Sequence, residues 1–330
     1  MEEVLVGVQN LKKYFPIKMG FFKTLTAKEN PVVRAVDDVS FNIRKKEIFG
    51  LVGESGSGKT TLGRLILRLI EPTEGKIFFK GADITTIPEN DMRKLRFEMQ
   101  IIFQDPYDSL NPRMSVYDII VEPLELQKVV DSQKEMKNRL IETLEEVGLT
   151  PPETFLYRFP HELSGGQRQR VAVARAFALR PEFVVADEPV SMLDASVRGE
   201  VLKLMLKILE KYGSTFLYIT HDLALSRVIC DRIAVMYFGK IVEMGPTDKI
   251  ISHPANPYTK ALLSAVLVPD PTVKRAKHVV KGEIPSPLNP PSGCRFHPRC
   301  QHATEFCKKK EPILVQVDKE HYVACHLVEK

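Results

Sequence analysis

The chain has 330 residues, of which 44% are hydrophobic and 27% are charged, and 47 lysines and arginines against 42 acidic residues leave a net charge of only +5. This length predicts about two domains, and so small a net charge argues against a strongly basic nucleic-acid-binding surface. No apolar run approaches the roughly 18 residues of a membrane span, and no basic start precedes an apolar segment, so we expect neither membrane insertion nor secretion.

The chain alternates short apolar, β-branched runs with segments of helical spacing. Residues 46–52 are predicted as a strand and residues 62–70 as a helix, with a glycine-rich loop between them. Apolar side chains recur at helical spacing between Lys134 and Gly148, where the glycine supplies a stop. Further predicted elements are a helix at 168–179, a strand at 183–186, a helix at 201–209 and strands at 216–219 and 233–237. This order predicts an α/β fold with a mainly parallel sheet.

The loop after the first strand, residues 53–60, reads GESGSGKT and fits the P-loop pattern G-x-x-x-x-G-K-[ST]. Its glycines let backbone N–H groups surround a phosphate, Lys59 reaches the β- and γ-phosphate oxygens, and the Thr60 hydroxyl binds Mg²⁺. The residues predicted to bind the nucleotide phosphates are Gly53, Ser55, Gly56, Ser57, Gly58, Lys59, Thr60 and Thr61.

Two carboxylates, Asp187 and Glu188, follow the apolar strand predicted at 183–186. Acidic residues at the end of a buried parallel strand lie where ligands bind in such sheets. Asp187 is predicted to orient Mg²⁺ and its waters, and Glu188 to activate the attacking water. The alternative is a simple helix N-cap, which the presence of a P-loop makes the minor interpretation.

Several further motifs identify which P-loop family the chain resembles. They are the LSGGQ segment at 163–167, Gln104 after the apolar residues 101–103, Ser191–Asp194, and His221 after residues 216–220. In this order they resemble the ATP-binding subunits of ABC transporters. No Asn-Lys-x-Asp motif occurs, so nothing indicates guanine selection.

The resemblance implies that two subunits pair head to tail and bury two ATP molecules between them. Ser164, Gly165, Gly166 and Gln167 would close on the γ-phosphate held by Lys59 of the other subunit. The resemblance also implies that His221 holds the γ-phosphate and the attacking water, that Gln104 contacts Mg²⁺ or water, and that Asp194 connects the two sites.

An aromatic residue near the N-terminus stacks on adenine in this family, and Tyr14 and Phe15 occupy that region. Phe15 is favoured, with Tyr14 as the alternative. One departure from the family pattern is the presence of Val190 and Met192 where Thr and Ala are common. These two residues affect the expected packing of the interface and leave the chemistry unchanged.

Four segments narrow the resemblance to ATPases of dipeptide and oligopeptide importers: residues 99–114, 257–263, 282–287 and 293–300. Such subunits are peripheral proteins at the cytoplasmic face of the cell membrane. Their partners are two permease subunits, a second ATPase of the same or a related kind, and indirectly an extracellular or periplasmic solute-binding protein. The alternatives are a nickel or other small-solute importer, and a non-transport ABC ATPase that binds DNA or ribosomes. The second is disfavoured because the chain has one ATP module and no heptad arms, so no nucleic-acid partner is expected.

Prolines recur between residues 254 and 293, where long helices cannot form, and we place a domain boundary there. The expected domains are an ABC ATPase at 1–253, with an antiparallel β subdomain and a helical subdomain at about 105–178, and a Cys-rich extension at 254–330.

Four cysteines lie in the last 37 residues: Cys294, Cys300, Cys307 and Cys325. In a reducing cytosol they could bind a metal, act as redox-active thiols or pack as small apolar residues. Their spacing has no knuckle pair of the kind that zinc prefers. The family resemblance implies a [4Fe–4S] cluster, with zinc as the alternative. Cys230, which stands alone, is expected to pack in the core.

Overall fold

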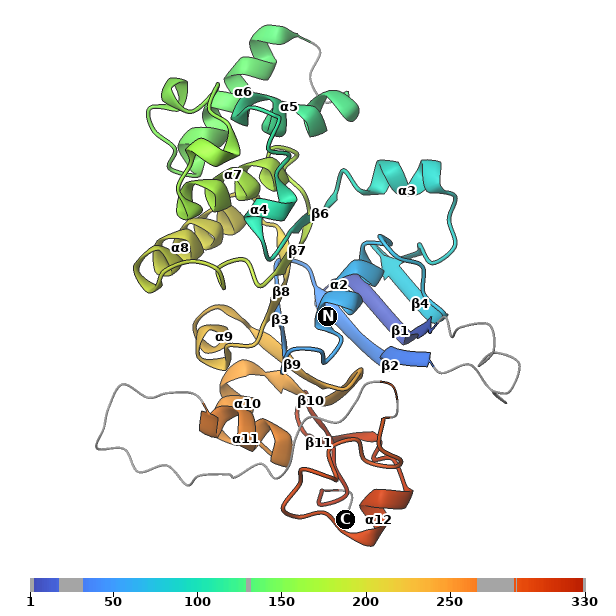
Figure 1. Cartoon of the computed structure of the whole chain (residues 1–330). Helices are drawn as coiled ribbons and strands as arrows, with labels where there is room; N and C mark the ends of the chain where they lie inside the picture. The colour runs from blue at the N-terminus through green and yellow to red at the C-terminus, as the bar shows by residue number, and fades with distance from the viewer. Residues whose placement is uncertain (1–2, 18–31, 129–131, 266–287, 289, 329–330) are drawn as a thin grey trace, which may run out of the picture. The chain divides into compact units, whose positions relative to one another are not determined.

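The computed structural model describes residues 3–17, 32–128, 132–265, 288 and 290–328 (Figure 1). The chain forms two compact units. The P-loop unit comprises residues 4–43, 48–85 and 219–330, and the helical unit comprises residues 1–3, 44–47 and 86–218. The motif at 282–287, used for the peptide-importer resemblance, lies outside the described residues. Among the described residues, no helix combines the length and the apolar composition that crossing a bilayer requires.

The P-loop unit contains an antiparallel sheet with the strand order β2-β1-β4-β5. The strands are β1 (Val4–Pro16), β2 (Val32–Arg44), β4 (Glu74–Phe79) and β5 (Ala82–Asp83). In β2, Val39, Phe41 and Ile43 are buried while the residues between them are exposed, the period-two pattern of a strand with one face on the core. Cross-strand pairing sets Val6 of β1 opposite Phe79 of β4. This sheet corresponds to the predicted antiparallel β subdomain.

A second set of strands in the same unit runs in the order β11-β12-β10-β9-β3. The strands are β3 (Ile48–Val52), β9 (Arg232–Tyr237), β10 (Lys240–Pro246), β11 (Leu314–Asp318) and β12 (His321–Ala324). The β3 and β9 strands are parallel, whereas β10 pairs antiparallel with both β9 and β12. The last strands of the chain thus extend the sheet that carries the P-loop, as the red and orange ribbons of Figure 1 show.

The helices of the P-loop unit are α2 (Lys59–Ile66), α9 (Leu223–Ile229), α10 (Thr247–Ser252), α11 (Pro257–Ala265) and α12 (Glu305–Lys309). The sequence predicted the first of them at 62–70, but it begins at Lys59 and ends at Ile66. Gly58 makes this early start possible, because its φ of 104° turns the chain directly into the helix. Cys230 follows α9 and is buried beside Gly50, which agrees with the expected packing role.

In the helical unit, β6 (Met99–Ile102) pairs parallel with β7 (Phe183–Asp187). The strand that follows β7 in the order of the sheet is β8 (Thr215–Thr220), whose first four residues belong to this unit. The five residues of β7 are all buried, as a central parallel strand requires. The helices are α3 (Glu89–Leu95), α4 (Pro106–Ser109), α5 (Val116–Leu126), α6 (Gln133–Glu146), α7 (Gly165–Phe177) and α8 (Ala195–Tyr212), with short 3-10 turns at Pro152–Thr154 and Pro160–Glu162.

Local sequence signals position these helices. Ser115 and Asp118 form a reciprocal capping box at the start of α5. The α6 helix begins after the N-cap Ser132 and buries Met136, Leu140 and Leu144, which lie on one face at a spacing of four residues. The strands and helices confirm the predicted α/β class.

Candidate functional site

The P-loop, residues 53–60, connects β3 with α2 and needs glycine at two points. A Cβ on Gly53 would lie 2.2 Å from the Met236 carbonyl oxygen, and a Cβ on Gly58 would lie 2.0 Å from the Ala35 carbonyl oxygen. Any side chain there would push the loop away from its neighbours. These two glycines of the motif are therefore required by the packing around them.

Lys59 is buried at the start of α2, and its ammonium group donates hydrogen bonds to the loop itself. The acceptors are the carbonyl oxygens of Gly53 at 2.8 Å and Glu54 at 2.9 Å, and Ser57 Oγ at 3.4 Å. Ser55 and Gly56 form the exposed tip of the loop. Thr60 and Thr61 occupy the first turn of α2, where backbone N–H groups and the helix dipole favour an anion.

Glu188 and Gln104 meet in the helical unit. Glu188 follows the last residue of β7, the buried Asp187, and Gln104 follows β6. Because β6 and β7 are parallel neighbours, both side chains emerge at the same edge, and Gln104 Nε2 donates a hydrogen bond of 3.2 Å to Glu188 Oε2. Glu188 has a φ of 45°, a left-handed conformation that costs a non-glycine residue energy and is typical of functional sites.

The LSGGQ segment begins α7. Ser164 is its N-cap, its hydroxyl accepts from the Gln167 backbone N–H at 3.3 Å, and the Gln167 side chain accepts from the Ser164 N–H at 2.9 Å. Ser164 is exposed, as is Asp194, the residue before α8. A Cβ on Gly166 would approach Val197 Cγ1 to 2.6 Å, so this glycine allows close packing of α7 and α8. Gly165 lies in the same helical turn.

His221 and the two N-terminal aromatic residues belong to the P-loop unit. His221 is exposed between β8 and α9, where Asp222 caps the helix by accepting from the Ala224 N–H at 2.8 Å. Tyr14 donates a 2.5 Å hydrogen bond to Asp37, whereas Phe15 is 39% exposed. Burial and the hydrogen bond to Asp37 raise the pKa of Tyr14 well above its ordinary value, so its hydroxyl remains protonated.

The predicted site residues therefore fall into two sets. The P-loop, Tyr14, Phe15 and His221 lie in the P-loop unit, and Gln104, Asp187, Glu188, the LSGGQ segment and Asp194 lie in the helical unit. Within the helical unit the structure places Gln104 against Glu188.

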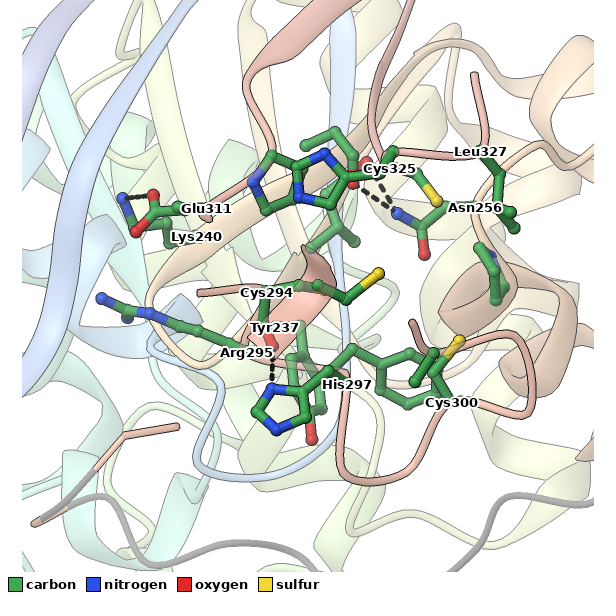
Figure 2. Close-up of a pocket in the computed structure, with 18 of the residues that line it drawn as sticks. Tyr237, Lys240, Asn256, Cys294, Arg295, His297, Cys300, Glu311, Cys325 and Leu327 are labelled. Atoms are coloured by element: carbon green, nitrogen blue, oxygen red, sulfur yellow. Dashed lines mark hydrogen bonds and ion pairs between the residues drawn. The ribbon is translucent and has the colours of Figure 1, made fainter. Parts of the chain in front are cut away.

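The four C-terminal cysteines line one cavity of about 60 Å³ in the P-loop unit. Figure 2 shows the sulfur atoms of Cys294, Cys300 and Cys325 around it, and Tyr237 and Asn256 also contribute to its wall. Burial raises the pKa of the Cys294 thiol to about 11 and also raises that of Cys300. Both groups are therefore neutral thiols at pH 7.

The prediction of a [4Fe–4S] cluster is wrong. Across the described residues, no group of three or more His, Cys, Asp or Glu side chains is arranged to hold a metal ion, so the zinc alternative has no support either. The prediction rested on the cysteine spacing and on the family resemblance, and neither determines how the side chains are arranged. The C-terminal segment is instead packed within the unit: β12 pairs with β10, and Phe296 and Val323 are buried.

The sequence did not identify three residues around the P-loop: Glu54, Tyr258 and Arg299. Arg299 forms an ion pair with Glu54 across 245 residues of chain. Glu54 occupies a variable position of the motif, and no local pattern connects it with a distant arginine. Their proximity is a property of the tertiary structure.

Comparison with known families agrees with these motifs. The sequence model described as ABC transporter matches residues 36–191, and the one described as oligopeptide/dipeptide transporter, C-terminal region, matches residues 242–307. A solved dimeric structure of the ATP-binding cassette MJ0796, in a post-hydrolysis state bound to ADP and Pi, is 30% identical with a TM-score of 0.64 and covers 74% of this chain and 99% of that one. CbiO1 of Clostridium perfringens, part of an ABC transporter complex, is 25% identical with a TM-score of 0.63, over 76% of this chain and 92% of that one.

Full-length relatives extend the agreement. A probable peptide ABC transporter ATP-binding protein of Sinorhizobium fredii is 46% identical over 99% of this chain and 91% of the relative. The oligopeptide transport ATP-binding protein AppF of Bacillus subtilis is 46% identical over 99% of this chain and 98% of the relative. With its P-loop, its LSGGQ helix and its C-terminal region, the chain belongs to the family of ATP-binding proteins of peptide ABC transporters.

Proposed function

We propose that this protein hydrolyses ATP to power the import of dipeptides or oligopeptides through a membrane ABC transporter. The observation that carries the proposal is the match at both ends of the chain: a P-loop ATPase followed by a region described as belonging to oligopeptide and dipeptide transporters. The relatives named for peptide or oligopeptide transport span nearly the whole chain, so the C-terminal region is included. A nickel importer is not favoured, because both findings point to peptides.

The residues of the P-loop fit a nucleoside triphosphate with Mg²⁺. Backbone N–H groups at the start of α2 and the Lys59 ammonium would hold the β- and γ-phosphates. Thr60 and Asp187 offer the hard oxygen ligands that Mg²⁺ takes, and Gln104 would contact the ion or a water on it. When bound, the ion would neutralise charge on the phosphates. Its binding to these three residues is part of the proposal.

Glu188 is proposed as the general base. Its carboxylate accepts a hydrogen bond from Gln104, which orients the group, and a carboxylate in this position would take a proton from the attacking water. His221 would hold the water and the γ-phosphate in line. The left-handed backbone of Glu188 supports this role, because strained conformations of this kind cluster at functional sites.

For the adenine ring, the contacts favour Phe15 over Tyr14. Tyr14 is held by its hydrogen bond to Asp37 and by Arg34, whose guanidinium lies 5.5 Å from the Tyr14 ring centre. Phe15 is exposed, with the Lys13 ammonium 5.1 Å from its ring centre, and an exposed ring offers a face for stacking.

The LSGGQ segment is proposed to complete the site of a second subunit. Ser164 and Asp194 are exposed, and the first turn of α7 presents N–H groups that suit an anion. The related cassette MJ0796 was solved as a dimer bound to ADP and Pi. The second subunit would be another copy or a related ATPase. Two permease subunits would hold the pair peripherally at the cytoplasmic face of the membrane, with a solute-binding protein acting indirectly and no nucleic acid involved.

Transport in a reconstituted system tests this function. The protein, its cognate permeases and the solute-binding protein are placed in liposomes, and uptake of a radiolabelled oligopeptide is measured with ATP on the side of this protein. We expect ATP-dependent peptide uptake that Lys59→Ala abolishes. Uptake of Ni²⁺ without uptake of peptide would refute the peptide proposal, and absence of ATP hydrolysis by the full assembly would refute the ATPase itself.

A further inference from the structure

Arg299, a buried residue of segment 294–300, contacts the side chain of a P-loop residue, Glu54. The Arg299 guanidinium donates two hydrogen bonds to the Glu54 carboxylate, Nη1 to Oε2 at 2.7 Å and Nη2 to Oε1 at 3.0 Å. The Arg299 side chain is 8% exposed. Two parallel charge-assisted bonds define both the position and the plane of the carboxylate, which one contact would not do. The second residue of the P-loop is therefore oriented by a residue near the end of the chain.

The backbone of the same P-loop residue is held by a second element. The Glu54 N–H donates to the Tyr258 hydroxyl at 2.9 Å, and Tyr258, on α11, is 1% exposed. The rings of Tyr258, Tyr237 and Phe296 form a cluster with centroids 4.5–5.3 Å apart. The Arg299 guanidinium lies 5.9 Å from the centres of the Tyr237 and Phe296 rings. Glu54 is thus fixed from both its side chain and its backbone by one packed group.

A second arginine of the segment, Arg295, contacts strand β2. Arg295 forms an ion pair with Asp37, and both side chains are at most 8% exposed. Asp37 also accepts a hydrogen bond of 2.5 Å from the Tyr14 hydroxyl. Burial alone would raise the pKa of Asp37, but the hydrogen bond from Tyr14 and the charge of Arg295 outweigh it and lower that pKa below its ordinary value. Tyr14 precedes Phe15, the residue proposed to stack on adenine.

We propose that Arg299 and Arg295 are positioning residues of the nucleotide site. Through Glu54, Arg299 holds the P-loop in place, and through Asp37 and Tyr14, Arg295 holds the end of β1. This inference rests on the proposed binding of ATP at the P-loop. Without Arg299, the Glu54 carboxylate is free to rotate, and the loop must be ordered by the nucleotide when it binds. That ordering reduces affinity, whereas saturating ATP restores the productive loop and leaves turnover nearly intact.

The test measures ATP affinity and turnover separately in full-length variants. For Arg299→Gln we expect the Kd for ATP, measured by calorimetry, and the KM to rise about tenfold, with kcat within about twofold of wild type. Arg299→Lys keeps the positive charge but cannot form the two parallel hydrogen bonds of a guanidinium group. Its Kd for ATP is therefore expected to lie between those of wild type and Arg299→Gln. Lys308→Gln is the matched control, because Lys308 pairs at 2.6 Å with Glu305 in the same region and both are exposed. Its Kd should be unchanged.

A double-mutant cycle identifies the contact through which Arg299 acts. If Arg299 works through Glu54, adding Glu54→Gln to Arg299→Gln weakens ATP binding far less than the sum of the single effects. Arg295→Gln is expected to raise the Kd as well. A wild-type Kd for ATP in Arg299→Gln would overturn the positioning role, whether or not the variant melts at a lower temperature. Fully additive effects of Arg299→Gln and Glu54→Gln on the Kd would overturn it as well. Failure of the wild-type protein to bind ATP in the same titration would instead refute the proposed nucleotide site.

Discussion

Replacing Glu188 with glutamine tests the chemistry most directly, because the change removes proton acceptance and preserves the shape of the site. Gln104 Nε2 donates to Glu188 Oε2 at 3.2 Å, and a glutamine side-chain oxygen can accept the same bond. The left-handed backbone at residue 188, φ 45°, does not depend on the charge of the side chain. We therefore expect Glu188→Gln to fold normally and to bind ATP with wild-type affinity.

The expected loss of rate follows from the role of a general base. Such a group contributes about 10²–10⁴-fold to a reaction, which corresponds to about 3–5 kcal/mol of transition-state stabilisation. The kcat of Glu188→Gln should fall by at least about 100-fold, with little change in KM. Because ATP then persists, the subunits should remain paired, and light scattering after gel filtration should show twice the monomer mass only when ATP is present.

A matched variant separates the base from a general effect of removing a carboxylate. Glu200 lies in the same helical unit, where it is exposed and pairs with Arg170 at 3.3 Å. Exposed pairs contribute little, so Glu200→Gln should keep kcat within about twofold of wild type. A Glu188→Gln protein that hydrolyses ATP at more than about a tenth of the wild-type rate would refute Glu188 as the base.

Three further predictions concern the P-loop unit. Gly58→Ala should weaken ATP binding at least about tenfold in an equilibrium titration, because φ is 104° and the new Cβ would meet a carbonyl oxygen at 2.0 Å. Glu243→Ala should lower the free energy of unfolding by about 3–5 kcal/mol in urea titration, since the fully buried carboxylate accepts from His321 and from the N–H groups of Ala255 and Asn256. With a pKa raised from 9.0 to about 11, the Cys294 thiol ionises only as the pH approaches 11. Its alkylation at pH 8 should be about 100-fold slower than that of an ordinary thiol and rise about tenfold per pH unit, as measured by mass spectrometry.

Each of these has a clear contrary result. Unchanged ATP affinity in Gly58→Ala would mean that the loop can shift at no cost. Wild-type stability of Glu243→Ala would show that the junction of β10 and β12 does not depend on this carboxylate. A Cys294 alkylation rate that is already at its maximum at pH 8 would contradict burial as the cause of its raised pKa.

The sequence alone was sufficient for the parts of the protein that depend on contiguous residues. Strand, loop and helix around the P-loop, residues 53–60, follow from local periodicity and from the glycine-rich motif itself. The Ser164 capping box is likewise local. By contrast, the meeting of Gln104 with Glu188 depends on the parallel pairing of β6 with β7, which the sequence pattern did not predict.

Only the tertiary structure decided what the C-terminal region does. Sequence spacing of the four cysteines was compatible with a metal site, but the side chains as placed form none among the described residues, because the spacing along the chain does not determine the positions of the sulfur atoms in space. The contact of Arg299 with Glu54 joins residues 245 positions apart. Local propensity carries no information about such a pair, since the two side chains meet only in the folded tertiary structure.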